Sequence, residues 1–400
     1  MSSSKKQPNI IVILSDDQGE WAMGCSGNPD VQTPNLDKLA DTGIRFSNFF
    51  CTSPVCSPAR ASLLTGKMPS QHGVHDWLRQ EKPEDGEIEY LQGQIGYTDI
   101  LAEHGYTCGL SGKWHVGNSK QPQKGFTSWY AHASGGGPYY HAPMYKDGEL
   151  VEEPGYVTDL ITDQGVSFIE DHANQANPFY LSVHYTAPHS PWIGQHPEEY
   201  VKLYEDCEFE SCPQLPEHPW STTDYGQNHK ENLKGYYASI TAMDANIGRI
   251  LDKLEELHIR ENTLIWFLSD NGFNFGHHGI WGKGNGTFPQ NMFDTSVKVP
   301  AIVSHPSRIP QGNVCDALVS GYDFMPTLLE YVGLDKPADE TLPGNSFVSY
   351  LLGGQADNEG RDHVVIYDEY GPVRMVRTKE WKYIGRYPDV PYDLYHLTDD

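Results

Sequence analysis

Short apolar runs alternate with amphipathic stretches along most of this 400-residue chain, and this rhythm constrains its fold more than any other feature. Residues 10–14 and 264–268 are apolar runs of strand length, whereas residues 231–257 keep the apolar spacing of one long helix. The alternation predicts an α/β fold with a mainly parallel sheet sandwiched by helices. Further predicted strands lie at 44–50, 106–110, 179–185 and 299–303, and further predicted helices at 34–42 and 98–104.

Two stretches break the rhythm and a third changes it. Residues 116–156 and 187–230 are rich in Gly, Pro, Tyr, His and Trp, and loops of that length are usually functional. From about Arg361, three short strand-like segments follow closely on one another, which predicts a small antiparallel α+β unit. We therefore expect a catalytic α/β domain over residues 1–350 and a small C-terminal subdomain over residues 351–400.

Charge and composition exclude several classes of protein. Lys and Arg total 28 against 54 Asp and Glu, which gives a net charge of −26 and disfavours binding to nucleic acid or an anionic membrane. An apolar fraction of 38 % is too high for a disordered chain. The first apolar run, at residues 10–14, is too short for a secretory signal, so the sequence as it stands predicts a cytoplasmic protein. A natural signal that had been removed would instead make it periplasmic or secreted.

Carboxylates follow two of the predicted strands at the point where each strand ends. Asp16 and Asp17 come directly after the run at 10–14, and Asp270 and Asn271 follow the run at 264–268. Open α/β sheets bind ligands at the carboxyl ends of their strands. One Asp-Asp pair alone is as often a solvated turn, but two such pairs with three carboxylates and an amide favour a hard divalent cation, calcium or magnesium.

A cysteine precedes a predicted helix start. Ser57 is a good N-cap, Pro58 suits the first helical position, and Gly66 can end the helix. Cys56 thus lies beside a helix N-terminus with Arg60 in the first turns, and the amide donors, the helix dipole and the guanidinium favour an anion there. A buried cysteine at a helix–strand corner is the simpler alternative.

The segment from Cys56 to Gly66 resembles the signature of type I sulfatases in the alkaline phosphatase superfamily, through Cys-x-Pro-x-Arg-x-x-Leu-x-Thr-Gly. The second signature of that family resembles residues 105–115, although Cys108 stands where the family usually has Ser or Thr. The resemblance implies an alkaline phosphatase-like fold, and a formylglycine that a maturation enzyme makes from Cys56 and whose hydrate is the nucleophile. It also implies a divalent metal, usually calcium, held by Asp16, Asp17, Asp270 and Asn271.

The resemblance further assigns catalytic roles. His189 resembles the histidine that protonates the leaving alcohol, and His115 a histidine base. Lys113 and Lys283 resemble the sulfate-binding lysines, and Arg60 the arginine that steadies the hydrate. Elementary chemistry agrees, because a sulfate ester needs its non-bridging oxygens neutralised and its leaving alkoxide protonated.

The sequence defines the substrate less closely than it defines the reaction. The aromatic and polar loops favour a sulfated saccharide, and the acidic surface favours a small molecule or a chain end. Two other functions stay open: a phosphonate or phosphate ester hydrolase of the same superfamily, and a metal-dependent binding module without catalysis. The oligomeric state is not predicted. Candidate substrate-pocket residues are His72, His75, Asp76, Trp77, Trp192 and Arg374. Ser134 is the candidate for a serine that some sulfatases carry between the Lys-x-His motif and the later histidine.

Overall fold

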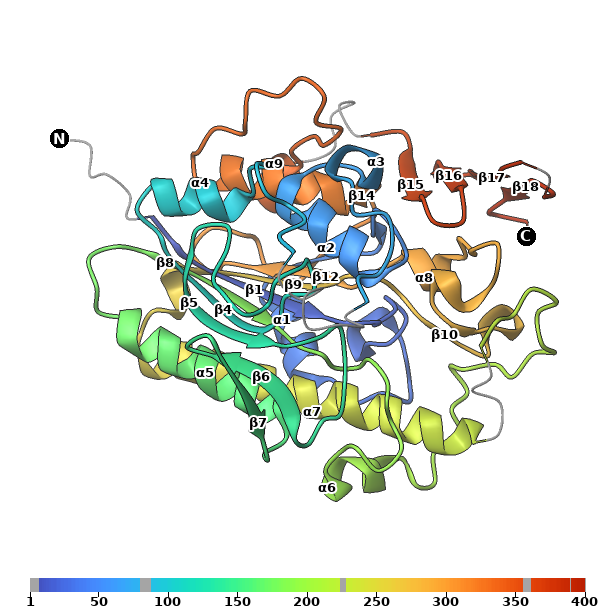
Figure 1. The fold of residues 1–400 in the computed structure, drawn as a ribbon, viewed down its shortest axis with the longest axis horizontal. Helices are drawn as coiled ribbons and strands as arrows, with labels where there is room; N and C mark the ends of the chain where they lie inside the picture. Colours follow the sequence, from blue (N-terminus) through green and yellow to red (C-terminus); the bar gives the residue numbers. More distant parts are fainter. Residues whose placement is uncertain (1–6, 80–87, 224–227, 355–360, 389, 400) are drawn as a thin grey trace.

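A ten-stranded sheet forms the centre of the protein in a computed structural model that describes residues 7–79, 88–223, 228–354, 361–388 and 390–399 (Figure 1). In spatial order its strands are β13 (Asn313–Cys315), β2 (Ile44–Phe46), β12 (Ala301–Ser304), β9 (Thr263–Ser269), β1 (Asn9–Ser15), β8 (Phe179–His184), β4 (Thr107–Lys113), β5 (Phe126–His132), β6 (Ala142–Lys146) and β7 (Glu149–Glu153).

The middle of this sheet is parallel. Strand β1 pairs in parallel with β9 on one side and with β8 on the other, and β4 continues the parallel order to β5. Antiparallel pairing occurs on both sides of this core, between β9 and β12 and from β5 to β7. The predicted α/β fold with a mainly parallel sheet is confirmed.

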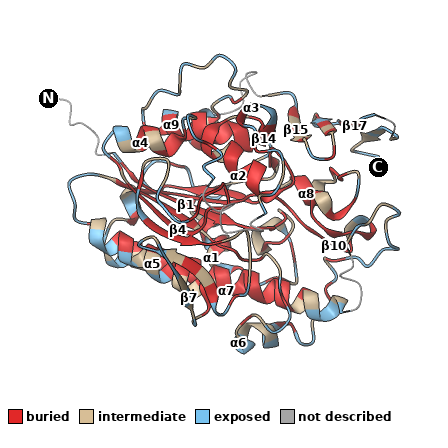
Figure 2. Cartoon of the chain, viewed as in Figure 1, coloured by how far each residue is buried: buried red, intermediate tan, exposed pale blue. Residues whose placement is uncertain are grey.

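Helices cover both faces of the sheet, as Figures 1 and 2 show. Because side chains alternate along a strand, Ile10, Val12 and Leu14 join the apolar core on one face, whereas Ile11 and Ile13 join the core on the other. One layer contains α2 (Cys56–Thr65), α4 (Tyr97–Glu103) and α9 (Phe324–Tyr331), and the other contains α1 (Pro34–Asp41), α5 (Val157–His172) and α7 (His229–Glu256). The shorter helices are α3 (Pro69–His72), α6 (Glu198–Val201), α8 (Asp294–Val297) and α10 (Val348–Leu351).

The stretch at 116–156 differs from the prediction, because it is not one long loop. Strands β5, β6 and β7 lie within it and extend the sheet at one edge. Edge strands carry many polar and exposed residues, so their apolar pattern is weak; β7 has no fully buried residue. The described residues of the stretch at 187–230 are mostly irregular, as expected, and include the short helix α6.

Helix α2 begins two residues earlier than predicted. Cys56 is its first residue, Val55 takes the N-cap position, and the Ser57 hydroxyl accepts the backbone N–H of Leu78 at 3.0 Å instead of capping the helix. Pro58 is tolerated in the first turn because its missing N–H has no intrahelical partner there. Gly66 ends the helix with a φ of 68°, as the sequence predicts.

A four-stranded antiparallel sheet near the C-terminus confirms the predicted small unit; the boundary between residues 350 and 351 stays a prediction. Arg377 and Lys382 of this sheet both pair with Asp294 of α8, which anchors the sheet to the rest of the protein. None of the helices among the described residues is long and apolar enough to cross a membrane. The sheet contains β15 (Val364–Asp368), β16 (Val373–Arg377), β17 (Trp381–Arg386) and β18 (Asp393–His396), and the remaining short strands are β3 (Phe49–Phe50), β10 (Asn274–Phe275), β11 (Trp281–Gly282) and β14 (Val319–Ser320).

Candidate active site

The two acidic pairs meet because the strands before them are parallel neighbours. Ser15 at the end of β1 lies opposite Ser269 at the end of β9, so the chain leaves both strands at the same edge of the sheet. There the backbone N–H of Asp17 donates to Asp270 Oδ1 at 3.2 Å, and Asn271 Nδ2 donates to Asp17 Oδ1 at 2.7 Å. The structure therefore brings the four predicted metal ligands together.

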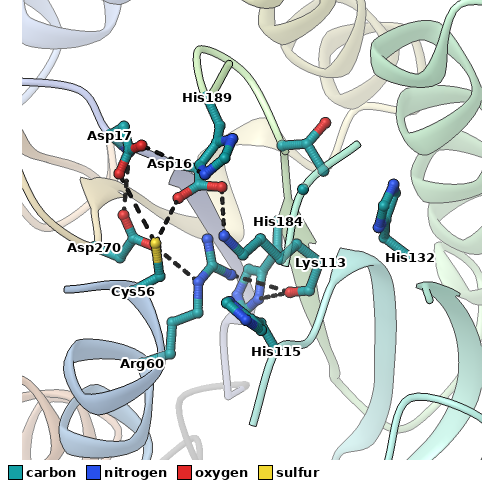
Figure 3. Close-up of polar contacts among 12 residues, drawn as sticks. Asp16, Asp17, Cys56, Arg60, Lys113, His115, His132, His184, His189 and Asp270 are labelled. Carbon is teal, nitrogen blue, oxygen red and sulfur yellow. Dashed lines mark hydrogen bonds and ion pairs between the residues drawn. The ribbon is translucent and has the colours of Figure 1, made fainter. Parts of the chain in front are cut away.

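Helix α2 points its N-terminus at this acidic group and places Cys56 against it (Figure 3). Cys56 Sγ lies 3.3 Å from Asp16 Oδ1 and 3.8 Å from Asp17 Oδ1, and Lys283 Nζ lies 2.8 Å from the sulfur. Burial, with Asp16 as the next cause, raises the pKa of the Cys56 thiol far above its usual range. An unmodified Cys56 is therefore a neutral thiol here and a poor nucleophile.

Three cationic side chains pair one to one with the three carboxylates. All six side chains are buried, so water screens their charges little. Each charge instead has an oppositely charged partner within contact distance. The pairs are Lys113–Asp16, Lys283–Asp17 and Arg60–Asp270, with N–O distances of 2.5, 2.6 and 2.8 Å.

Burial and neighbouring charges separate the pKa values of the carboxylates. Burial and the nearby Asp270 raise the pKa of Asp16. Burial also opposes ionisation of Asp17, but Lys283 and His189 outweigh it and hold its pKa below the usual range. Burial is likewise outweighed at Asp270, where Arg60 is the strongest opposing charge and the pKa is lowered.

The acidic group suits a hard divalent cation. Oxygen atoms of Asp16, Asp17 and Asp270 and the sulfur of Cys56 all lie within 4.8 Å of one another. Asn271 Oδ1 is buried and has no hydrogen-bond partner among the described residues, so a further oxygen ligand is available. Three carboxylates and an amide oxygen are ligands that calcium and magnesium prefer.

A cavity of ≈ 470 Å³ opens above Cys56. Four of the six predicted catalytic residues line it: Cys56, His115, His189 and Lys283. Arg60 and Lys113 do not line it; Arg60 is paired with Asp270, and its Nη1 donates to the carbonyl of Lys113 at 3.0 Å. They lie against the acidic group that adjoins the cavity.

Two histidines line the cavity together with Cys56. His189 Nε2 lies 3.6 Å from Asp17 Oδ2, and its Nδ1 contacts the Ser190 carbonyl at 2.7 Å. His115 Nε2 contacts the Leu78 carbonyl at 3.0 Å. Burial and then Lys113 lower the pKa of His115 well below its usual range, so its ring is neutral.

Only some of the predicted substrate-pocket residues reach the cavity. Of these, Trp77 lines it, and so does Ser134, the separate candidate for the family serine. Trp192 is buried against Phe273 and Phe275, and its indole N–H donates to Pro188 O at 2.8 Å. Trp192 is therefore part of a buried aromatic cluster behind the cavity and not of its lining.

The other candidates lie elsewhere. His72 is buried, and its Nε2 contacts the Ser62 hydroxyl at 2.9 Å. His75 and Asp76 do not line the cavity. Arg374 belongs to the C-terminal sheet, where it pairs with Glu369 at 2.9 Å and faces a different groove.

Sequence reasoning missed several residues of the cavity lining. The glycine run in residues 135–137 carries a visible signal, since glycines gather where the backbone comes close to other groups. The others lie on separate loops and share no motif. The missed lining residues include Leu78, Arg79, Gly135, Gly136, Ser190, Thr223, Phe273, Gly282 and Asn285.

The fold and this site define a class of enzymes, the sulfuric ester hydrolases with an alkaline phosphatase-like fold. A family model described as "Sulfatase" matches residues 8–334, and one described as "N-sulphoglucosamine sulphohydrolase, C-terminal" matches residues 276–400. The chain belongs to the sulfatase family, and it is a sulfatase that hydrolyses sulfate esters.

Named relatives and a solved structure agree with this assignment. The chain is 28 % identical to an N-acetylglucosamine-6-O-sulfatase of Bacteroides thetaiotaomicron, over 99 % of this chain and 81 % of the relative. It is 31 % identical to an N-acetylgalactosamine-6-sulfatase of Canis lupus familiaris, over 88 % and 68 %. A solved structure in complex with its substrate D-glucosamine-2-N,6-O-disulfate matches with a TM-score of 0.83 and 25 % identity, over 98 % of this chain and 92 % of that one.

A phosphonate monoester hydrolase of Agrobacterium radiobacter also shares the architecture. Its TM-score is 0.76 at 21 % identity, over 98 % of this chain and 90 % of that one. At that identity the likeness shows a common fold alone. The alternative function as a phosphonate hydrolase therefore gains no support from the comparisons beyond the fold.

Proposed function

We propose that the protein removes a sulfate group from the 6-position of an N-acetylated amino sugar. The observation that carries this proposal is the placement of Cys56 at the cavity between Lys283, His115 and His189. The named substrates of the two relatives supply the choice of sugar and position. Trp77, exposed at 39 % on the cavity wall, carries the Arg79 guanidinium over its ring at 4.7 Å, so an indole and a cation lie together where a sugar ring would bind.

Lys283 is the cation placed to bind the sulfate group. Its Nζ lies within 2.8 Å of Cys56 Sγ and also lines the cavity, so an anion above residue 56 would contact it directly. Lys113 and Arg60 do not line the cavity, but they pair with Asp16 and Asp270, the carboxylates beside Cys56. Together they neutralise negative charge that would otherwise repel a sulfate.

His189 is the proton donor in this proposal. Its Nδ1 is held by the Ser190 carbonyl, while Nε2 faces Asp17 at the cavity. When the bond between sulfur and the sugar oxygen breaks, Nε2 gives its proton to that oxygen, which leaves as an alcohol. The overall hydrolysis consumes one water and yields the sugar alcohol and sulfate.

Two groups complete the proposed site. The grouped carboxylates of Asp16, Asp17 and Asp270 and the buried Oδ1 of Asn271 support a divalent cation, which we propose to be calcium. It would supply positive charge toward the sulfate oxygens. Formylglycine at position 56, made by a maturation enzyme, would supply a hydrate hydroxyl as the nucleophile that a neutral thiol does not. The location of the protein in the cell stays a prediction of the sequence.

A panel of defined esters tests this proposal. Protein co-produced with a formylglycine-generating enzyme is given 6-sulfated N-acetylglucosamine and N-acetylgalactosamine, their 3- and 4-sulfated isomers, and nitrophenyl sulfate, phosphate and phosphonate. We expect the highest kcat/KM on a 6-sulfated sugar, formylglycine at residue 56 by mass spectrometry, and no turnover by Cys56→Ala. Faster turnover of phosphonate than of any sulfate, or full activity of Cys56→Ala, would refute it.

A further inference from the structure

Residues 134–136, in the loop that joins β5 to β6, form part of the cavity wall. Gly135 and Gly136 line the cavity beside the two histidines. The loop is fastened to itself, because the Ser134 hydroxyl donates to the Gly136 carbonyl at 2.7 Å and the Ser134 N–H donates to His132 Nδ1 at 3.2 Å. It is therefore a defined wall against which other side chains can pack.

Each of these glycines lies against the ring of a different histidine. A β-carbon at Gly135 would lie 2.2 Å from both Cε1 and Nε2 of His115. A β-carbon at Gly136 would lie 2.8 Å from both Cε1 and Nδ1 of His189. In both cases the three nearest atoms all belong to that one ring, so any side chain would displace the histidine before it met another group.

Backbone conformation does not explain why glycine occupies these positions. Neither Gly135 nor Gly136 has a φ in the left-handed region, although many other glycines of this chain do. Their φ values lie outside the range that disfavours an L-residue. Glycine is therefore needed at these positions because it lets the loop backbone lie directly against the two imidazole rings.

Fixed carbonyl groups hold the same rings. His115 Nε2 contacts the Leu78 carbonyl at 3.0 Å, and His189 Nδ1 contacts the Ser190 carbonyl at 2.7 Å. The carbonyl of His189 itself accepts a hydrogen bond from the Tyr139 hydroxyl at 2.8 Å. The glycine loop and these contacts together restrict where each ring can lie.

We propose that Gly135 and Gly136 are positioning residues, which keep His115 and His189 in place at the cavity by leaving room for their rings. For Gly136 the proposal rests on the proposed role of His189 as the proton donor to the leaving alcohol. Displacing that ring should therefore affect esters that need a proton on the leaving oxygen. Esters with a good leaving group should be spared.

Gly136→Ala tests this in the full-length, formylglycine-bearing enzyme. We expect kcat on a 6-sulfated amino sugar to fall by about 10²-fold or more, the usual share of a general acid, with KM little changed. On nitrophenyl sulfate, whose leaving phenolate needs little protonation, kcat should fall by less than about threefold. Gly137→Ala is the matched control, since its β-carbon would approach only His132, at 3.3 Å, and should leave both activities within about twofold.

The double variant His189→Ala/Gly136→Ala separates the two ideas. With the ring removed, Gly136→Ala should lower turnover of the sugar sulfate no further. If His189→Ala reduces both substrates equally, the proposed proton donor is wrong. If His189→Ala is selective for the sugar but Gly136→Ala is not, the positioning role is wrong. A folding defect of Gly136→Ala that persists in the double variant would also overturn it, because the clash would then not involve the His189 ring. For Gly135, Gly135→Ala should lower turnover of both esters in the wild-type background, but not in the His115→Ala background. A further loss in His115→Ala/Gly135→Ala would overturn the positioning role of Gly135.

Discussion

Acidification from pH 7.5 to pH 5.5 should destabilise this protein through histidines that the fold keeps neutral. His72, His132, His196 and His305 are all buried. Burial lowers the pKa of His72 and His196 to about 3 and that of His132 and His305 to about 4. In the unfolded chain the same groups take up protons near their ordinary pKa of about 6.5. Because the pKa values of these histidines are lower in the folded protein than in the unfolded chain, only the unfolded chain gains protons as the pH falls from 6.5 toward 4. The free energy of unfolding is therefore unaffected by these histidines above pH 6.5 and decreases below it.

The magnitude follows from the shifts. At pH 5.5 each of the four histidines favours the unfolded state by about 1.4 kcal/mol, since the unfolded form gains roughly a factor of ten from protonation. Three buried carboxyls act in the opposite direction: burial raises the pKa of Asp244, Asp323 and Asp368 to about 6, so they take up protons in the folded state. Each returns about 0.8 kcal/mol at pH 5.5, so these seven groups together give a net loss of about 3 kcal/mol. His115, His184 and His277, whose pKa values burial also lowers, add to the loss in the same direction.

Urea denaturation at the two pH values, with calcium saturating in both, measures this loss. His196→Gln should reduce the difference between the two pH values by about 1.4 kcal/mol, because burial is the only cause of its shift. His258→Gln, at an exposed position, is the matched control and should leave the difference unchanged. A free energy of unfolding that stays constant or rises at pH 5.5, or an unchanged difference in His196→Gln, would refute the reasoning.

Three further predictions concern packing, substrate binding and the metal. Trp192→Ala should lower the free energy of unfolding by about 3–5 kcal/mol, because it opens a cavity in a buried aromatic cluster. Trp77→Ala on the cavity wall should change stability by less than about 0.5 kcal/mol but raise KM for a sugar sulfate, which denaturation and steady-state kinetics can show. Chelation should lower the melting temperature and abolish turnover, and calcium should restore both, because Asp16, Asp17 and Asp270 would lose the cation that we propose they bind. A melting temperature that the chelator leaves unchanged would argue against the metal site.

The sequence determined the order of the main elements and the position of the acidic group. Periodicity is a local property, so the apolar runs before Asp16 and Asp270 were sufficient to predict two strands with carboxylates at their ends. Parallel pairing then brings such ends to one edge of a sheet. The signature from Cys56 to Gly66 predicted the family for the same reason, since helix start, nucleophile position and helix end all lie within eleven consecutive residues.

Only the tertiary structure decided which residues face the cavity. Lys283 and Lys113 are both lysines of the predicted sulfate site, yet Lys283 lines the cavity and Lys113 lies beneath it, paired with Asp16. Trp192 lies in a loop that the sequence identifies as functional, but its ring packs into the core. The approach of Gly136 to His189 joins positions 53 residues apart. Such contacts join residues that are far apart in the sequence and depend on how the loops fold over the sheet. A local pattern of residues therefore cannot predict them.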